Sequence, residues 1–212
     1  MKQLTIEQLL HELGSKNGKY TGGTGIGLVS VLSATLTQFI FELQLGKKKY
    51  IKDQAQLEQI IEHAKQLSDE FLRLTEEDST VFEQVLSAYK MPKISTEEKE
   101  LRQQAIDNGY VQSSLPLLNI MRNLVELLDL YEQLIDLQVS GPILSDALMS
   151  VQFIQAAAVS AERMIENNLY EVKQSEKALP IQDALIQTKQ KLNKKIKKVT
   201  DAIESYLKYN KW

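Results

Sequence analysis

Apolar residues recur along most of this chain at the three- and four-residue spacing that is typical of amphipathic α-helices. The longest run of this pattern covers residues 54–89, roughly ten helical turns, and Pro92 ends it. No segment alternates apolar and polar residues over enough positions to predict a β-strand. The pattern therefore predicts an all-α protein.

Capping residues and prolines divide the rest of the chain into further helices. Thr5 with Gln8, and Ser95 with Glu98, form capping-box patterns that open two of them, and Pro180 stands where the first residue of the last helix is expected. Besides residues 54–89, helices are expected over residues 1–14, 26–45, 95–137 with a kink or break at Pro116, 143–161 and about 180–209. We therefore expect a bundle of about six long helices.

Two of the predicted helices are almost free of charge. Residues 21–41 contain no charged side chain, and residues 143–161 contain only Asp146. The first segment carries several serine and threonine residues, so we interpret it as a core helix and not as a membrane span. Helices that are apolar almost all round must be surrounded, and the small residues between 156 and 161 are suited to meet a second subunit. A homodimer is therefore expected.

Composition restricts the chemistry that this chain can perform. Its 212 residues suffice for one core, and we expect a single helical domain over residues 1–212, with the last helix, about 180–209, packing on it. Cysteine is absent, which excludes disulfides and thiolate catalysis, and the two histidines, His11 and His63, lack metal-ligand spacing. A net charge of -3 predicts no nucleic-acid partner. The N-terminal segment lacks a signal-peptide layout, so we expect a cytoplasmic protein without membrane association.

Asp78 is the clearest anomaly in the pattern. It lies seven residues after Phe71 and four after Leu74, on a stripe that Phe82 and Val85 continue, so it is predicted to point into the core. Burying an unpaired charge costs several kcal/mol, so such a carboxylate needs a partner or a function. From the pattern alone, a core aspartate that pairs with a lysine or caps another helix is favoured over a catalytic group.

Glycines gather before the first uncharged helix. Six of the nine fall between Gly14 and Gly27, and residues 20–27 are expected to form a glycine loop that enters the N-terminus of that helix. Free backbone amides at a helix N-terminus bind anionic or carbonyl groups. Because the segment lacks the strand of a Rossmann fingerprint and the GK[ST] end of a P-loop, it is by itself a weak indication of a binding site.

Three further features have both an ordinary and a functional interpretation. Asp146 follows Ser145 in the first turn of a predicted helix, where both side chains ordinarily satisfy free amides. The lysines at 47–49 suit the C-terminal dipole of a helix that Gly46 caps, but could also hold an anionic ligand. The lysines between residues 189 and 198 are most simply the solvated face of the last helix.

Several motifs occur in order between residues 4 and 169. They are the glycine loop that opens an uncharged helix, Gly46-Lys47-Lys48-Lys49-Tyr50, Glu77-Asp78, Ala88-Tyr89-Lys90-Met91-Pro92-Lys93, Leu115-Pro116-Leu117 and Ser145-Asp146. This set resembles the cyclodeaminase/cyclohydrolase family of folate enzymes, whose members are all-helical homodimers that bind a tetrahydrofolate derivative. The resemblance implies ligand binding by Gly22, Gly23, Thr24, Lys47, Lys49 and Ser145, and catalysis by Asp78 and Asp146.

The same resemblance implies an enzyme that acts on the carbon bridging N5 and N10 of tetrahydrofolate. A cyclohydrolase adds water to the methenyl carbon, whereas a cyclodeaminase lets N10 attack an N5-formimino carbon and releases ammonia. Both reactions need a carboxylate that moves a proton and stabilises a cationic carbon, and neither needs a metal or a redox cofactor. Asp78 is then the expected acid or base, Asp146 an ionised group that acts electrostatically or holds the pterin, and Lys47 and Lys49 bind the glutamate tail.

One departure from the family pattern motivates alternatives. Residues 21–25 read Thr-Gly-Gly-Thr-Gly, whereas the family usually carries Pro-Gly-Gly-Gly-Ser, and the Cβ of Thr24 takes up space beside the backbone that a ligand would need. The first alternative is a non-catalytic homologue that binds a folate or another anion. The second is a helical scaffold or regulatory partner that uses its basic last helix.

Overall fold

A computed structural model describes residues 4–16, 18 and 20–212 of the chain. The described residues form six α-helices and one short 3₁₀-helix and contain no strand. The elements are α1 (Ile6–Leu13), α2 (Gly22–Glu42), the 3₁₀-helix η1 (Lys48–Tyr50), α3 (Gln54–Tyr89), α4 (Thr96–Asp136), α5 (Ile143–Tyr170) and α6 (Ser175–Tyr209). The prediction of an all-α protein with about six helices is confirmed for this part of the chain.

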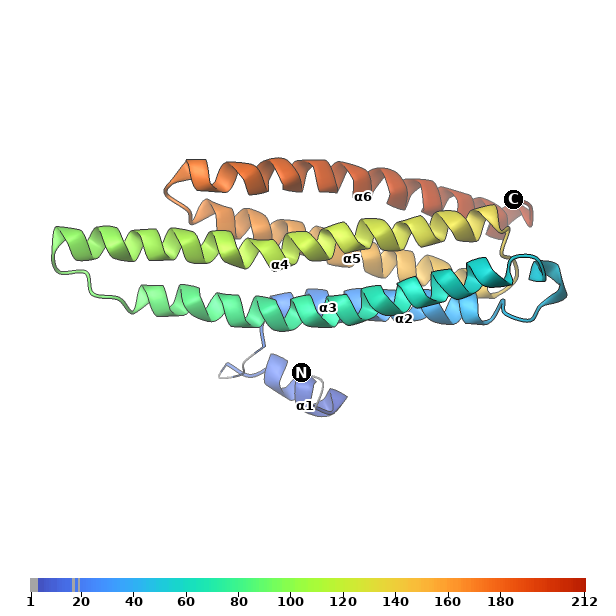
Figure 1. Ribbon diagram of the computed structural model, residues 1–212, viewed down its shortest axis with the longest axis horizontal. Helices are drawn as coiled ribbons and strands as arrows, with labels where there is room; N and C mark the ends of the chain where they lie inside the picture. The colour runs from blue at the N-terminus through green and yellow to red at the C-terminus, as the bar shows by residue number, and fades with distance from the viewer. Residues whose placement is uncertain (1–3, 17, 19) are drawn as a thin grey trace.

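The long helices lie side by side in one elongated bundle (Figure 1). Helix α2 packs on α3 and α5, while α4 packs on α3, α5 and α6 and so occupies the middle of the arrangement. The connections between α2 and α3 and between α4 and α5 lie at one end of the bundle, beside the C-terminus. The connections between α3 and α4 and between α5 and α6 lie toward the opposite end. Helix α1 stands apart from the bundle and has its main contacts with α2.

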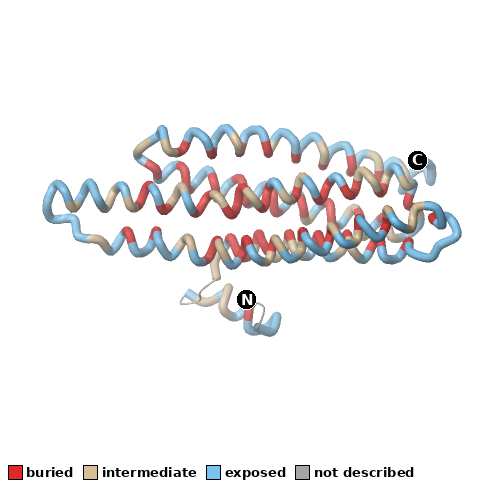
Figure 2. The backbone as a smooth tube through the Cα atoms, in the orientation of Figure 1, coloured by how far each residue is buried: buried red, intermediate tan, exposed pale blue. Residues whose placement is uncertain are grey.

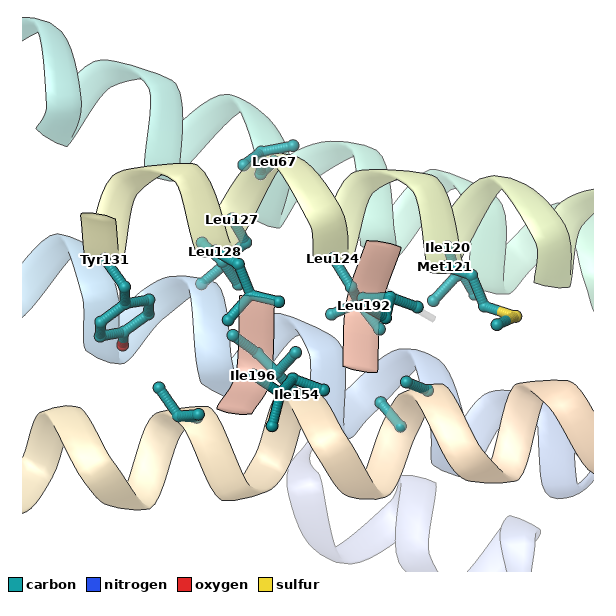
Figure 3. Packing of buried hydrophobic residues seen from close by; sticks show 14 of the residues in the cluster. Leu67, Ile120, Met121, Leu124, Leu127, Leu128, Tyr131, Ile154, Leu192 and Ile196 are labelled. Atoms are coloured by element: carbon teal, nitrogen blue, oxygen red, sulfur yellow. The ribbon is translucent and has the colours of Figure 1, made fainter. Parts of the chain in front are cut away.

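The buried residues lie on the sides where the helices face one another (Figure 2). Helix α4 contributes Leu124, Leu127 and Leu128, whose three- and four-residue spacing turns them toward neighbouring helices. They pack with Ile154 of α5 and Leu192 of α6 (Figure 3). A core shared by five helices explains why each long segment carries its own apolar stripe.

Two predicted helix starts are confirmed by their caps. Thr5 Oγ1 accepts a hydrogen bond of 3.2 Å from the backbone N–H of Gln8, and Ser95 Oγ accepts one of 3.1 Å from that of Glu98. In both capping boxes the residue at the third helical position also reaches back to the backbone N–H of the cap. Residues 1–3 of the predicted first helix lie outside the described residues.

Three other predicted boundaries differ from the structure. Helix α4 continues through Pro116. The proline does not end the helix because the turns on both sides of it are packed in the core. Helix α5 extends beyond residue 161, since Ile165 and Leu169 continue its buried stripe. Of the new charges, Arg163 and Glu166 are exposed, whereas the buried Glu162 pairs with Lys189 of α6. Pro180 is not the first residue of the last helix: α6 begins at Ser175 and packs on α4 and α5, and Pro180 lies on its exposed side.

The two uncharged helices are not surrounded within one chain. By length and composition, α2 and α5 could each cross a membrane, but only half of the most apolar window of α2 and 39% of that of α5 is buried in the bundle. Leu32 and Phe39 of α2 are 53% and 46% exposed, and Met149 and Val159 of α5 are also exposed. The expectation that these helices pack on all sides is therefore wrong for the single chain. These four residues mark what we call the α2/α5 face.

Candidate functional site

The predicted glycine loop is for the most part helix. Helix α2 begins at Gly22, with Thr21 as its N-cap, so Gly23 lies at the second helical position. Among the described glycines, a positive φ occurs only at Gly46 and Gly141, on other segments. The loop therefore ends at Thr21, and the glycines that follow it do not serve to allow a left-handed backbone.

Close packing explains these glycines instead. A Cβ on Gly23 would lie 1.9 Å from Oδ2 of Asp78, and a Cβ on Gly27 would lie 1.8 Å from Oγ1 of Thr75. Both distances are far shorter than any van der Waals contact, whereas a Cβ on Gly25 would meet nothing within 4 Å. Gly23 and Gly27 thus allow the backbone of α2 to rest directly on polar side chains of α3.

A small polar cluster is buried at this contact, and we call its five residues the Asp78 cluster. It consists of Gly23 and Thr24 of α2 and Thr75, Asp78 and Ser79 of α3, all of them buried. The hydroxyl oxygens of Thr24 and Ser79 lie 3.5 Å apart. Thr75 and Ser79 donate their hydroxyl protons to carbonyls of their own helix, at 2.6 Å and 3.3 Å. Those two hydroxyl protons are therefore not directed at the carboxyl of Asp78.

The carboxyl of Asp78 is buried and has no charge partner among the described residues. The residue is 3% exposed, and no hydrogen bond or ion pair to its carboxyl comes from the part of the chain that the structure describes. Burial alone raises the pKa of Asp78 from an ordinary 3.8 to about 6. The interpretation that it pairs with a lysine is therefore wrong among the described residues. A carboxyl with this pKa can gain and lose a proton near neutral pH.

A groove runs along the other side of the first turns of α2. It is a cavity of about 440 Å³ between α2 and α5, and it opens on the α2/α5 face. Helix α2 contributes Gly22, Gly25 and Val29 to its lining, and α5 contributes Ala156, Ser160 and Met164. No charged side chain of a described residue lines the groove, and its walls are mostly small residues.

The remaining predicted site residues lie at the far end of α2. Lys47 follows α2, and from Gly23 to Glu42 the helix spans 19 residues, or about 28 Å. Ser145 and Asp146 lie in the first turn of α5, which starts at that same end of the bundle. One chain therefore brings Gly22, Gly23, Thr24 and Asp78 together and keeps Lys47, Lys49, Ser145 and Asp146 apart from them.

The two lysines have local partners at that far end. Lys49 donates to the carbonyl oxygen of Gln138 and, at 3.3 Å, to the hydroxyl of Ser140, which ties η1 to the connection between α4 and α5. Lys47 donates to Oε1 of Gln44 at 2.9 Å. Gly46 has a φ of +72° but does not cap α2, which already ends at Glu42. Lys49 thus holds η1 against the connection between α4 and α5, whereas Lys47 is exposed to solvent.

Sequence reasoning did not identify Thr75, Ser79 or Gly27 as neighbours of the site. Thr75 precedes Asp78 by three residues and Ser79 by four, so Thr75 shares a side of α3 with each of them. Gly23 and Gly27 are four residues apart, a spacing that puts both on one side of a helix. That spacing could have indicated a helix that packs closely on a neighbour, where a loop was predicted.

Comparisons with known proteins agree with this fold. The family model described as Formiminotransferase-cyclodeaminase matches residues 5–187. The methenyltetrahydrofolate cyclohydrolase of Methylorubrum extorquens is 30% identical over 128 residues, which are 60% of this chain and 62% of that protein. The formimidoyltransferase-cyclodeaminase of Rattus norvegicus is 23% identical over 109 residues, 51% of this chain and 20% of that protein. The matches therefore span less than two thirds of either curated relative.

The same fold occurs in a solved structure. The crystal structure of formiminotetrahydrofolate cyclodeaminase from Thermotoga maritima matches with a TM-score of 0.85 and 17% identity, over 97% of this chain and 98% of that one. At this identity the likeness shows the fold. The bundle described above is thus an arrangement that a cyclodeaminase also has.

Proposed function

This chain belongs to the formiminotransferase-cyclodeaminase family, and on that premise we propose that it is an enzyme that acts on the carbon bridging N5 and N10 of a tetrahydrofolate derivative. The proposed reaction is that of a methenyltetrahydrofolate cyclohydrolase or of a formiminotetrahydrofolate cyclodeaminase, the names that its relatives carry. The observation that carries the proposal is the buried carboxyl of Asp78, whose pKa lies close to neutral. Such a group is suited to proton transfer at the reacting carbon.

In the cyclohydrolase direction, Asp78 acts first as a base. It takes a proton from water as the water oxygen bonds to the cationic methenyl carbon, and it returns this proton to N5 as the bond between that carbon and N5 breaks. The second proton of the water leaves to solvent, and the product is the 10-formyl form. A cationic substrate beside the carboxylate also offsets the desolvation that raises its pKa, so the basic form is favoured in the complex.

In the cyclodeaminase direction, the same carboxyl moves a proton between two nitrogens. N10 bonds to the formimino carbon and loses its proton to Asp78, which passes it to the departing nitrogen. A second proton taken up from solvent completes the ammonia that leaves as the bond between carbon and nitrogen breaks, and the methenyl product keeps the positive charge. The developing positive charge on the carbon is stabilised by the ionised carboxylate. A single group with a pKa of about 6 serves as base and acid in both directions.

A second copy of this chain covers the α2/α5 face in our proposal. Leu32 and Phe39 project from α2, while Gly22 and Gly25 of the same helix line a groove of small residues. A two-fold axis that crosses α2 near Leu32 runs the two copies of this helix antiparallel. Phe39 follows Leu32 by seven residues and Gly25 precedes it by seven, so each phenyl ring meets the groove of the other copy.

The same symmetry assembles the predicted site from two subunits. An antiparallel pair of α2 helices places the end of one subunit that carries Lys47 and Asp146 beside the first turns of α2 in the other, whose opposite side contacts Asp78. This arrangement removes the separation of about 28 Å along α2. Lys47 and Asp146 of one subunit then hold the glutamate tail and the pterin of a folate whose bridging carbon reaches Asp78 of the partner.

The direct test is enzymatic. Methenyltetrahydrofolate absorbs in the near ultraviolet, so its loss in the presence of the protein reports the cyclohydrolase reaction, and its formation from 5-formiminotetrahydrofolate reports the cyclodeaminase reaction. We expect one of these signals, and we expect Asp78→Asn to abolish it. Thermal stabilisation by a tetrahydrofolate derivative without turnover would instead support the non-catalytic binding homologue.

A further inference from the structure

A basic cavity lies at the end of the bundle that is remote from the C-terminus. It has a volume of about 420 Å³ and is formed where the connection between α3 and α4 meets the start of α4 and the connection between α5 and α6. Lys93 comes from the first of these segments, Lys99 and Arg102 from the first two turns of α4, and Lys173 from the last. Among the described residues, Glu100 is the one acidic residue in its lining.

The four cations of this cavity have no acidic partners among the residues that the structure describes. None of the ion pairs formed by the described residues involves Lys93, Lys99, Arg102 or Lys173. Four lysines of α6, by contrast, form ion pairs: Lys189, Lys195, Lys197 and Lys198. The positive charge at the cavity is not neutralised by a described carboxylate and is therefore available to an anion from outside the chain.

Arg102 is held by Tyr89, and not all of its N–H donors have an acceptor. Its Nη2 donates to the carbonyl oxygen of Tyr89 at 3.2 Å, and its guanidinium carbon lies 5.3 Å from the centre of the Tyr89 ring. Its Nε–H is buried and has no acceptor among the described residues. A buried guanidinium donor without an acceptor is uncommon, because it loses its hydration without replacement. The guanidinium of Arg102 is therefore short of one hydrogen-bond acceptor among the described residues.

Lys173 is positioned by a buried carboxylate. Asp107 is fully buried and accepts hydrogen bonds from the backbone N–H groups of Lys173 at 3.2 Å and Gln174 at 3.0 Å. Gln103, which also lines the cavity, donates to the same carboxylate at 2.7 Å. The connection between α5 and α6 is thereby fastened to α4, so the backbone that carries Lys173 is fixed before any ligand arrives.

We propose that this cavity binds a small polyvalent oxyanion, the class that contains phosphate esters and polycarboxylates. An arginine fork beside three ammonium groups, with a single opposing carboxylate, matches an anion that carries several charged oxygens. Tyr89 lies 11 residues beyond Asp78 on α3, so the cavity is about 17 Å further along the bundle than the Asp78 cluster. It is a separate site from the one proposed for the bridging carbon of folate.

Calorimetry on the full chain tests the proposal with two probes, inorganic pyrophosphate and citrate, at two salt concentrations. We expect one probe or both to bind at one site per chain, with an affinity that falls as salt increases. Lys99→Ala and Lys173→Ala should each weaken binding by about tenfold, and Lys99→Arg should retain it. Tighter binding of pyrophosphate assigns the site to phosphate ligands, and tighter binding of citrate assigns it to carboxylates.

Lys65→Ala is the matched control, because Lys65 is an exposed lysine of α3 outside the cavity and its replacement removes the same charge. It should bind as the wild type does, and circular dichroism melts of all variants identify any that fail to fold. Lys93→Ala, in a segment without helix, serves if one of the other variants does not fold. Absence of saturable binding of both probes, or an equal loss in Lys65→Ala, overturns the proposal.

Discussion

Asp78 and Gly23 are so close that a Cβ on Gly23 would lie 1.9 Å from Oδ2 of the carboxyl. This contact joins the first turn of α2 to the middle of α3, and it encloses the carboxyl on one side with backbone instead of with a side chain. Gly23 therefore contributes to the burial of the Asp78 carboxyl. Because this burial raises the pKa of Asp78, the contact also affects the pH range in which the carboxyl exchanges a proton.

The first prediction follows from that contact. Gly23→Ala should lower the free energy of unfolding by about 1–3 kcal/mol, because α2 or Asp78 must move to admit the methyl group, and it should lower kcat as the carboxyl is displaced. Gly25→Ala is the control on the same helix, since its Cβ meets nothing within 4 Å. It should be neutral or stabilise by up to about 1 kcal/mol through helix propensity. Urea denaturation compares the two variants, and equal stabilities would contradict the close contact.

The second prediction concerns the catalytic role of Asp78. Asp78→Asn should reduce turnover to background, because the amide keeps the shape of the carboxyl and cannot transfer a proton. In the wild type, kcat/KM should fall as pH decreases below about 6, where the carboxyl becomes protonated and can no longer accept a proton. Asp69→Asn, an exposed position on the same helix, should leave both quantities unchanged. Full activity in Asp78→Asn would remove Asp78 from the mechanism.

The third prediction is a gain of stability from the same substitution. The pKa of Asp78 is raised on folding, so ionisation of this residue opposes folding: stability is lost between pH 3.8 and about 6 and stays lower above that range. Replacing Asp78 with Asn removes this penalty. Asp78→Asn should therefore be more stable than the wild type by about 1–3 kcal/mol at pH 8 and nearly equal to it at pH 4. Denaturation at the two pH values measures the difference, and an Asn variant that is less stable at pH 8 would show that the carboxylate has a stabilising partner.

The sequence predicts features that depend on one helix better than features that depend on contacts between helices. The inward position of Asp78 was predictable because it rests on the helical period of α3, which a single chain determines. The helical state of Gly23 was not, since glycine runs ordinarily favour loops, and the approach of α3 that explains Gly23 and Gly27 is a contact between distant segments. The separation of Lys47 from Asp78 depends on which helices are neighbours, and the local pattern contains no information about that.

The fourth prediction tests the α2/α5 face. Phe39→Glu should convert a dimer into a monomer at micromolar concentration, because it places a charge where an apolar side chain enters the groove of the other copy. Ile186→Glu is the control, since Ile186 is an exposed apolar residue of α6, on a different part of the bundle. Light scattering coupled to size-exclusion chromatography gives the masses. A wild type that is already monomeric at this concentration would contradict the proposed interface.

The fifth prediction distinguishes a site within one chain from a site shared by two. Asp78→Asn and Asp146→Asn should each be inactive alone, because each variant damages every site of its own dimer. If Asp78 of one subunit works with Asp146 of the other, a mixed dimer contains one site in which both residues are intact and one in which both are replaced.

Unfolding the two variants together and refolding them at equal concentration produces mixed dimers as about half of the population. With one working site in each, the mixture should recover about a quarter of the wild-type activity. A site built within one chain predicts no recovery, since every Asp78 or its own Asp146 is then replaced. Activity of Asp146→Asn by itself would show that Asp146 is not needed, and the same experiment with Lys47→Ala would then decide whether the far end of α2 takes part at all.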